Sequence, residues 1–354
     1  MQSVENYLAS LQIGIADIYR ETNPCTERIY IAFRDATGAA KLKRKLNEVK
    51  SVLGAPDAVF TEVIPGRPLT ASVEFNNNST DILRHESLPD FKQFPGHLPV
   101  VVGVDSYNQP LYFDLASCPH LLIAGVTGQG KSVCLHTILK SLVAQECELF
   151  IIDPKQSELL DFKEYTGRTN KYFRRGEAYS HTVKGAIGGL MTLEKEIRER
   201  NLLFTSKNVK NIEEYNEISE KKLERDVFVC DEFGDLSTNK DVTRTIHYVS
   251  DGYKEKSVIV KTTRGQEFQH LVKRVAMIGR SAGIHLVLST QRPSAQIVDG
   301  DIKANFPTRI AFRMVTGTDS RVVLDTNGAQ NLKGRGDAIF MDASGYRRFQ
   351  CAMI

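Results

Sequence analysis

The stretch HLLIAGVTGQGKSVCLH (His120–His136) decides the fold class of this chain. A short apolar strand runs into a glycine-rich turn and then into a helix-like segment that begins with Lys-Ser. Such a turn fits the pattern G-x-x-x-x-G-K-[ST], whose backbone N–H groups surround phosphates at a helix N-terminus. The pattern predicts that a nucleoside triphosphate contacts the following residues: Gly125, Val126, Thr127, Gly128, Gln129, Gly130, Lys131, Ser132 and Val133.

Around this turn, apolar strands alternate with helical segments, which is typical of a parallel sheet. Near-continuous apolar runs suit strands that helices cover on both faces. Five strands are predicted: 120–125, 148–153, 227–231, 284–290 and 309–314. We therefore expect an α/β, RecA-like P-loop ATPase with a parallel central sheet flanked by helices.

The strand VFVCD is followed by further acidic residues, in VFVCDEFGDL (Val227–Leu236). Lys131 would reach the β- and γ-phosphates, and Ser132 and Asp231 would hold Mg²⁺. Glu232 would polarise the attacking water as general base. An additional strand, ending at Asp153, lies between the two motifs in the sequence. This arrangement indicates a RecA-like motor that uses ATP and Mg²⁺, rather than a GTPase-like switch.

Other polar residues end neighbouring strands at the same predicted edge. Gln291, in LVLSTQRPS, would lie near the γ-phosphate and report its loss, or would be a solvated loop residue. Asp153 and Lys155, in IIDPK, are either structural or couple the site to another subunit. Motors of this branch usually receive an arginine from a neighbouring subunit. Arg321 is the first choice for that role, Arg309 the second, and Arg313 flanks the same strand.

Length and composition limit the classes of protein to which the chain can belong. The chain has 354 residues, 41% of them hydrophobic, and a formal net charge of +3, which does not by itself indicate a nucleic-acid binder. No run of 18 apolar residues and no secretory signal is present, so we expect no membrane insertion and a cytoplasmic location. The cysteines are scattered, as in a reducing compartment. No histidine spacing indicates zinc.

The first part of the chain is predicted to be a small α+β domain, residues 1–95, followed by the motor domain, 96–354. Strands are expected at Arg28–Phe33, Ala58–Ile64 and within ASVEFNNN, with a helix over Ala39–Gly54. The segment Leu88–Pro99 contains three prolines and is the expected linker.

Several longer stretches resemble the motor of the FtsK/SpoIIIE DNA translocases. They include PHLLIAGVTGQGKSV, FIIDPKQSEL, VFVCDEFGDL and, most specifically, Ala282–Phe340. The resemblance extends over about residues 24–354. It implies a hexameric ring that hydrolyses ATP and pumps double-stranded DNA. It also implies nucleotide chemistry at Lys131, Ser132, Asp231, Glu232 and Gln291, and places Gly328–Asp337 near the nucleotide or a subunit boundary.

Three features depart from that family pattern. The sequence shows neither an N-terminal membrane region nor the C-terminal winged-helix module, and it contains an extra segment at about 240–274. Within this segment, TIHYVSDGYKEKSVIVKTT is predicted to form a hairpin. Residues 250–274 have six basic and three acidic side chains, a local charge of +3. Lys254, Lys256, Lys261 and Arg264 would contact the phosphate backbone of DNA, or the hairpin is simply a charged, solvated element.

Three functions remain open from the sequence. The first is a translocase of double-stranded DNA, acting on chromosomal or mobile-element DNA. The second is a conjugative-transfer or genome-packaging motor of the same superfamily. The third is a RecA-like ATPase that remodels protein.

Overall fold

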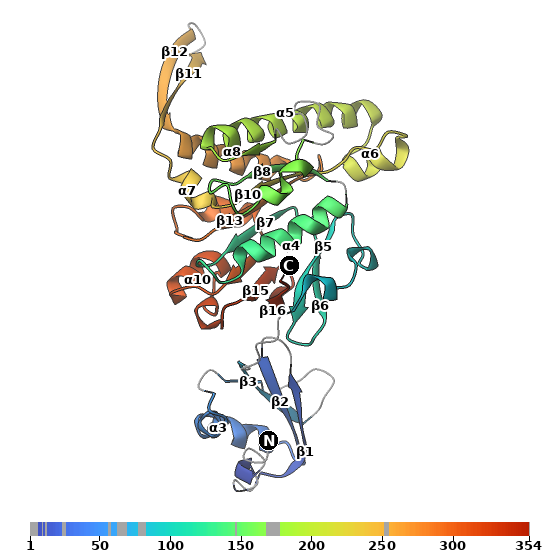
Figure 1. Ribbon diagram of the computed structural model, residues 1–354, viewed down its shortest axis with the longest axis vertical. Coiled ribbons are helices and arrows are strands. Elements are labelled where there is room, and N and C mark those ends of the chain that lie inside the picture. Colours follow the sequence, from blue (N-terminus) through green and yellow to red (C-terminus); the bar gives the residue numbers. More distant parts are fainter. Residues whose placement is uncertain are drawn as a thin grey trace. The chain divides into compact units, whose positions relative to one another are not determined.

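The structure is a computed structural model that describes residues 6–8, 10, 13–22, 26–55, 58–61, 69–76, 83–145, 147–167, 178–250 and 255–353. The chain divides into two compact units (Figure 1). The first contains residues 1–83 and 104–109, and the second contains 84–103 and 110–354. The expected linker, Leu88–Pro99, is thus part of the second unit, where it includes the short turn η2 (Phe91–Gln93) after η1 (His85–Ser87). The domain boundary at 95/96 stays a prediction.

In its described residues, the first unit contains a four-stranded sheet and the short helices α2 and α3. The strand order is β1-β2-β4-β3, and each neighbouring pair is antiparallel. The elements are β1 (Ile15–Thr22), β2 (Thr26–Phe33), α2 (Gly38–Arg44), α3 (Leu46–Leu53), β3 (Val59–Thr61) and β4 (Thr70–Asn76). Leu42 and Val49 are buried against the sheet in one apolar cluster.

Sequence reasoning describes this unit only partly. The single helix predicted over Ala39–Gly54 is two helices that meet at Lys45. Gly54 ends the second helix in the left-handed region (φ +62°), where glycine has no side chain to clash. The edge strand β1 was not predicted, and the end of the strand expected at Ala58–Ile64 lies outside the described residues.

The second unit is built on a ten-stranded sheet with the order β6-β5-β16-β15-β14-β7-β13-β10-β8-β9. From β14 to β9 the neighbours are parallel, whereas β14–β15 and β15–β16 are antiparallel. The five predicted strands are confirmed as β7 (His120–Ala124), β8 (Glu148–Ile152), β10 (Asp226–Cys230), β13 (Ile284–Thr290) and β14 (Thr308–Phe312). The strands not predicted are β5 (Pro99–Asp105), β6 (Pro110–Asp114), β9 (Tyr179–Ser180), β15 (Asp337–Asp342) and β16 (Gly345–Cys351).

Helices cover both faces of this sheet, which confirms the predicted α/β fold class. Along β10, Phe228 and Cys230 join one apolar cluster, and Val227 and Val229 join the other. The first cluster contains residues of α5 and α8, and the second contains residues of α4. The helices are α4 (Lys131–Ala144), α5 (Val183–Lys207), α6 (Ile212–Ile218), α7 (Phe233–Ser237), α8 (Arg264–Ile278), α9 (Gly300–Asn305) and α10 (Gly317–Leu324), with the turns η3 (Leu160–Tyr165) and η4 (Ala329–Asn331).

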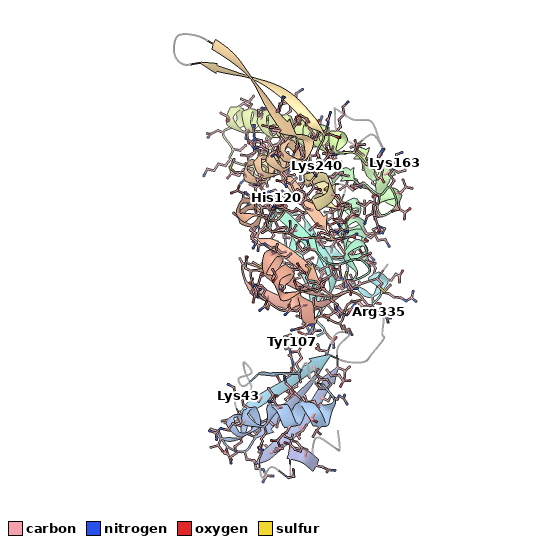
Figure 2. The ribbon with its side chains drawn as sticks, turned by 90° about the vertical axis from the view of Figure 1, so that its left-hand side faces the viewer. Lys43, Tyr107, His120, Lys163, Lys240 and Arg335 are labelled. Carbon is pink, nitrogen blue, oxygen red and sulfur yellow. The ribbon has the colours of Figure 1, made fainter. Side chains whose placement is uncertain are left out.

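His120 shows how the start of the P-loop strand is held in place (Figure 2). The Nε2 atom of its buried ring lies 2.8 Å from the carbonyl oxygen of Ala276 in α8. The Nδ1 atom accepts a hydrogen bond from the backbone N–H of Leu286 in β13. Burial lowers the pKa of His120 to about 4, so the ring is neutral at pH 7. The neutral ring can therefore donate at one nitrogen and accept at the other.

The predicted hairpin is also present. β11 (Val242–Ser250) and β12 (Glu255–Thr263) pair antiparallel as a separate two-stranded sheet, which extends away from α5 and α8 (Figure 1). Thr263 then caps α8 in a reciprocal pair of hydrogen bonds with Gln266. The Asp251-Gly252 turn lies outside the described residues.

Two further findings concern the described part of the chain. It contains no helix with the length and apolar character needed to cross a lipid bilayer. Five of the cysteines fall within it and all five are free thiols: Cys118, Cys134, Cys147, Cys230 and Cys351.

Candidate nucleotide-binding and hydrolysis site

The P-loop connects β7 to α4, and its glycines are required by geometry. Gly128 and Gly130 have φ values of +78° and +111°, a region that residues with side chains rarely adopt. A Cβ atom on Gly130 would also lie 2.9 Å from the Cα atom of Gly336. No side chain caps the N-terminus of α4, so the backbone N–H groups of its first turn are available to an anion. The predicted residues from Gly125 to Val133 all belong to this loop and turn.

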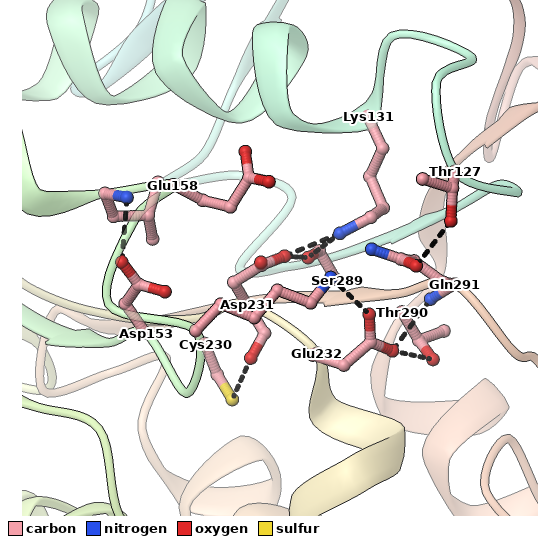
Figure 3. Close-up of polar contacts among 12 residues, drawn as sticks. Thr127, Lys131, Asp153, Glu158, Cys230, Asp231, Glu232, Ser289, Thr290 and Gln291 are labelled. Atoms are coloured by element: carbon pink, nitrogen blue, oxygen red, sulfur yellow. Dashed lines mark hydrogen bonds and ion pairs between the residues drawn. The ribbon is translucent and has the colours of Figure 1, made fainter.

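Lys131 and Asp231 form a buried ion pair at the centre of the site (Figure 3). The Lys131 Nζ atom lies 2.5 Å from Oδ1 of Asp231, and the two side chains are 3% and 1% exposed. Ser289 completes the cluster, since its hydroxyl lies 3.0 Å from Nζ and donates to the same carboxylate oxygen. Burial alone would raise the pKa of Asp231, but Lys131 and Ser289 hold it below its ordinary value.

Glu232 begins α7 in a left-handed backbone conformation (φ +57°). Its Oε1 atom accepts the backbone N–H of Gln291 at 2.9 Å and the hydroxyl of Thr290 at 3.3 Å. Burial raises the pKa of Glu232, although the Gln291 amide and the charge of Lys131 oppose the rise. A carboxylate with a raised pKa is better suited to accept a proton near neutral pH than an ordinary glutamate.

Gln291 joins the P-loop to Glu232. Its side-chain Oε1 accepts the hydroxyl of Thr127 at 2.7 Å, while its backbone N–H bonds to Glu232. The residue is therefore in contact with the loop that would hold phosphates and with the candidate general base. This placement agrees with the predicted sensor position, and the sensor role itself stays a prediction.

The structure separates the two residues of IIDPK that the sequence left undecided. Asp153 is buried and accepts the amide of Leu159 and the hydroxyl of Tyr179, each at 2.9 Å, so it shapes the loop after β8. Lys155 instead reaches toward the site, with Nζ 3.9 Å from Oε2 of Glu232. The pairing of Lys155 with Glu232 was not predicted.

The glycine-rich segment Gly328–Asp337 lies against the P-loop. The amide of Gly336 donates to the carbonyl of Gln129 at 2.9 Å, and a Cβ atom on Gly334 would lie 2.2 Å from the side-chain oxygen of Gln129. Gly334 and Gly336 have φ values of +85° and +93°, a backbone region that residues with side chains rarely adopt. In this chain the segment thus supports the P-loop from the side of β14 and β15.

The arginines divide into different environments. Arg309, the second choice for an arginine that acts on a neighbouring subunit, is 4% exposed and bonds to Phe306, Val323, Lys303 and Asp325 of its own chain. The buried guanidinium donates four hydrogen bonds within its own chain and holds α9, β14 and α10 together, which argues against that assignment. Arg321 is exposed on α10, where it bonds to Asn327 and Thr318. Arg313 is also exposed.

The predicted DNA-contacting residues are only partly described. Lys261 is exposed near the base of the hairpin, and Arg264 is partly exposed at the start of α8. Lys256 belongs to β12, but its side chain, like the whole of Lys254, lies outside the described part. Their role in DNA binding stays a prediction.

The acidic end of the site suits a magnesium ion. The Oδ2 atom of Asp231 is buried and has no hydrogen-bond partner among the described residues, so one carboxylate oxygen is left for a ligand. Within the described ranges, no three His, Cys, Asp or Glu side chains gather closely enough to hold a metal by themselves. Mg²⁺ commonly binds through one or two protein oxygens together with phosphates and water.

The ion pair makes a testable prediction about stability. Replacing Lys131 by Met leaves the buried Asp231 charge uncompensated, so we expect the free energy of unfolding to fall by about 3–5 kcal/mol. Adding Asp231→Asn to this variant removes the stranded charge and should restore part of the loss. Urea denaturation of the two single variants and the double variant measures the coupling. Lys207→Met, at an exposed position, is the control. If the effects of Lys131→Met and Asp231→Asn on the free energy of unfolding simply add, the ion pair is contradicted.

Comparison with known proteins adds two kinds of relatives. DNA translocase FtsK of Shewanella oneidensis is 30% identical over 352 residues, which cover 96% of this chain and 37% of that protein. DNA translocase FtsK of Chlorobaculum tepidum is 35% identical over 276 residues, or 75% of this chain and 31% of that protein. The chain thus spans about a third of the length of these relatives.

Solved structures share the fold. The pCW3 conjugation coupling protein TcpA, in a monomer form with ATPgS, superposes with a TM-score of 0.66 at 22% identity. That match covers 99% of this chain and 93% of TcpA. EssC from Geobacillus thermodenitrificans (ATPases 2 and 3) gives a TM-score of 0.60 at 16% identity, over 78% of this chain and 47% of that one.

Residues 87–295 match the FtsK/SpoIIIE family. They include the P-loop, Asp231, Glu232 and Gln291, and they make up more than half of the sequence. This chain therefore belongs to the FtsK/SpoIIIE family.

Proposed function

We propose that this chain is the motor of an ATP-dependent translocase of double-stranded DNA that works as a ring, a hexamer, in the cytoplasm. The observation that carries the proposal is the joining of Lys131, Asp231, Glu232 and Gln291 in one site, in a chain whose translocase relatives match it over nearly its whole length. Neither the fold nor the site alone selects DNA as the substrate.

The hydrolysis step follows from the groups in the site. ATP phosphates would draw Lys131 away from Asp231, and Ser132 and Asp231 would then hold Mg²⁺. Bound there, the ion supplies charge neutralisation at the β- and γ-phosphates. Glu232 accepts a proton from the attacking water, and Gln291 passes the presence of the γ-phosphate from Thr127 to Glu232. Arg321 acts on the site of a neighbouring subunit.

DNA enters the proposal through the named relatives, which are DNA translocases. Residues 250–274, from the hairpin turn into α8, have a local charge of +3, which suits contact with a phosphate backbone and needs no reading of bases. The alternatives are a conjugative-transfer or packaging motor, and an ATPase that remodels protein. The fold is compatible with the first alternative, because the conjugation coupling protein TcpA has it too, and EssC shows that other ATPases share it.

ATP hydrolysis measured without DNA, with single-stranded DNA and with duplex DNA tests the proposed function. We expect duplex DNA to raise kcat, single-stranded DNA to raise it less, and Glu232→Gln to lower kcat by about 10²–10⁴-fold while ATP still binds. A matched control is Glu217→Gln, at an exposed position in α6.

Each outcome points to one function. Stimulation by single strands alone would favour transfer of a single strand, and stimulation by neither nucleic acid would contradict a DNA motor. An absence of hydrolysis with every substrate would contradict the ATPase itself. Mass measurement of the same samples with duplex and nucleotide tests the ring, and a monomer throughout would contradict it.

The hairpin is tested separately. Replacing Lys256, Lys261 and Arg264 together by alanine removes three cations, so we expect weaker DNA stimulation with unchanged ATP binding. If all three contact phosphates, the slope of log affinity for duplex against log salt should flatten by about 2–3. The control variant replaces Lys207, Lys221 and Lys222, which changes the net charge equally. Equal slopes in the two variants would show that the hairpin cations are merely solvated.

A further inference from the structure

Lys155 approaches the candidate general base, Glu232, from the loop that follows a neighbouring strand. It follows β8 in the sequence, whereas Glu232 follows β10, and these two strands are adjacent and parallel. The Lys155 Nζ atom lies 3.9 Å from Oε2 of Glu232. The loop that bears Lys155 is fixed by Asp153, which bonds to the amide of Leu159 and the hydroxyl of Tyr179. The lysine therefore starts from a rigid base.

The two oxygens of Glu232 are held differently. Oε1 accepts two hydrogen bonds, from the Gln291 amide and the Thr290 hydroxyl. Oε2 is buried and has no hydrogen-bond partner among the described residues, and the Lys155 ammonium lies 3.9 Å from it. Two donors on one oxygen restrict its position but leave the other oxygen to be oriented by a further group.

This contact differs from an ordinary surface ion pair. Exposed pairs contribute little to stability because water screens both charges. Here the Glu232 side chain is 4% exposed and that of Lys155 is 39% exposed, so a cation at the solvent boundary faces a buried anion. Lys131, the other lysine of the site, is already committed to Asp231 at 2.5 Å. When phosphates attract Lys131, Lys155 is the cation that stays beside the acids.

We propose that Lys155 is a positioning residue that orients the Oε2 atom of Glu232 toward the attacking water. This inference rests on the proposed ATPase function. It assigns to the loop after β8 an indirect part in hydrolysis, through Glu232, whereas Asp153 in the same loop is structural. The lysine itself does not touch the reacting atoms.

Steady-state hydrolysis with Lys155→Met, Lys155→Arg and Lys222→Met tests this assignment. Lys222 is exposed in the segment before β10, at the opposite end of that strand from Glu232. We expect Lys155→Met to lower kcat by about 10–100-fold, part of the general-base contribution, with the KM for ATP and the dissociation constant of a fluorescent ATP analogue within about twofold. Lys155→Arg should recover most of kcat, and Lys222→Met should match the wild type.

The same lysine substitution in a Glu232→Gln background gives the decisive comparison. With the carboxylate gone there is nothing to orient, so Lys155→Met should cause no further loss of kcat. An equal loss in both backgrounds, an unchanged kcat, or no recovery with arginine would overturn the assignment.

A failure of the proposed function has a different signature. If the wild type binds the ATP analogue and hydrolyses nothing, the ATPase proposal is contradicted. The unfolding free energies of the two single variants and the double variant then test the contact itself. Coupling between positions 155 and 232 would support the contact, and additive effects would overturn it.

Discussion

The buried ion pair between Lys131 and Asp231 is the interaction on which the site depends. It joins the start of α4 to the end of β10 across the strand between them, and Ser289 of that strand bonds to both partners. A buried pair of this kind costs a great deal of desolvation and is stable only while both charges are matched. An anion with more charge than one carboxylate can therefore compete for the lysine. The pair keeps the site assembled, and under the proposed function it would also make the site respond to phosphates.

Around that pair, the parallel strands bring the remaining groups together. The carboxyl ends of β7, β13, β10 and β8 meet at one edge of the sheet and contribute the P-loop, Gln291, the two acids and Lys155 in turn. Contacts run continuously from Thr127 through Gln291 and Glu232 to Lys155. A change at the phosphates thus has a physical route to the far side of the site. On the other flank, Gly334 and Gly336 hold the P-loop from beside β15.

The sequence predicts those parts of the fold that are decided locally. The five strands with continuous apolar runs were found because helices cover both their faces, and the P-loop because its glycines are a local requirement. The edge strand β1 was missed because its residues are only partly buried or exposed, so no apolar run marks it. Contacts between distant residues leave no local pattern either. The Lys155–Glu232 contact and the buried hydrogen bonds of Arg309 depend on the arrangement of the whole sheet. Of these site residues, only Ser289 has a local signal in the sequence, because it is a polar residue at the end of an apolar strand.

The most direct test of this account is the distance between Lys131 Nζ and the Asp231 carboxylate in a structure determined with Mg²⁺ and a non-hydrolysable ATP analogue. It is 2.5 Å in the structure described here. The account predicts that Nζ moves to a phosphate oxygen and leaves ion-pair range of Asp231, beyond about 4 Å, while the metal ion takes its place. A nucleotide-bound structure in which the pair stays intact and the ion is held elsewhere would contradict it.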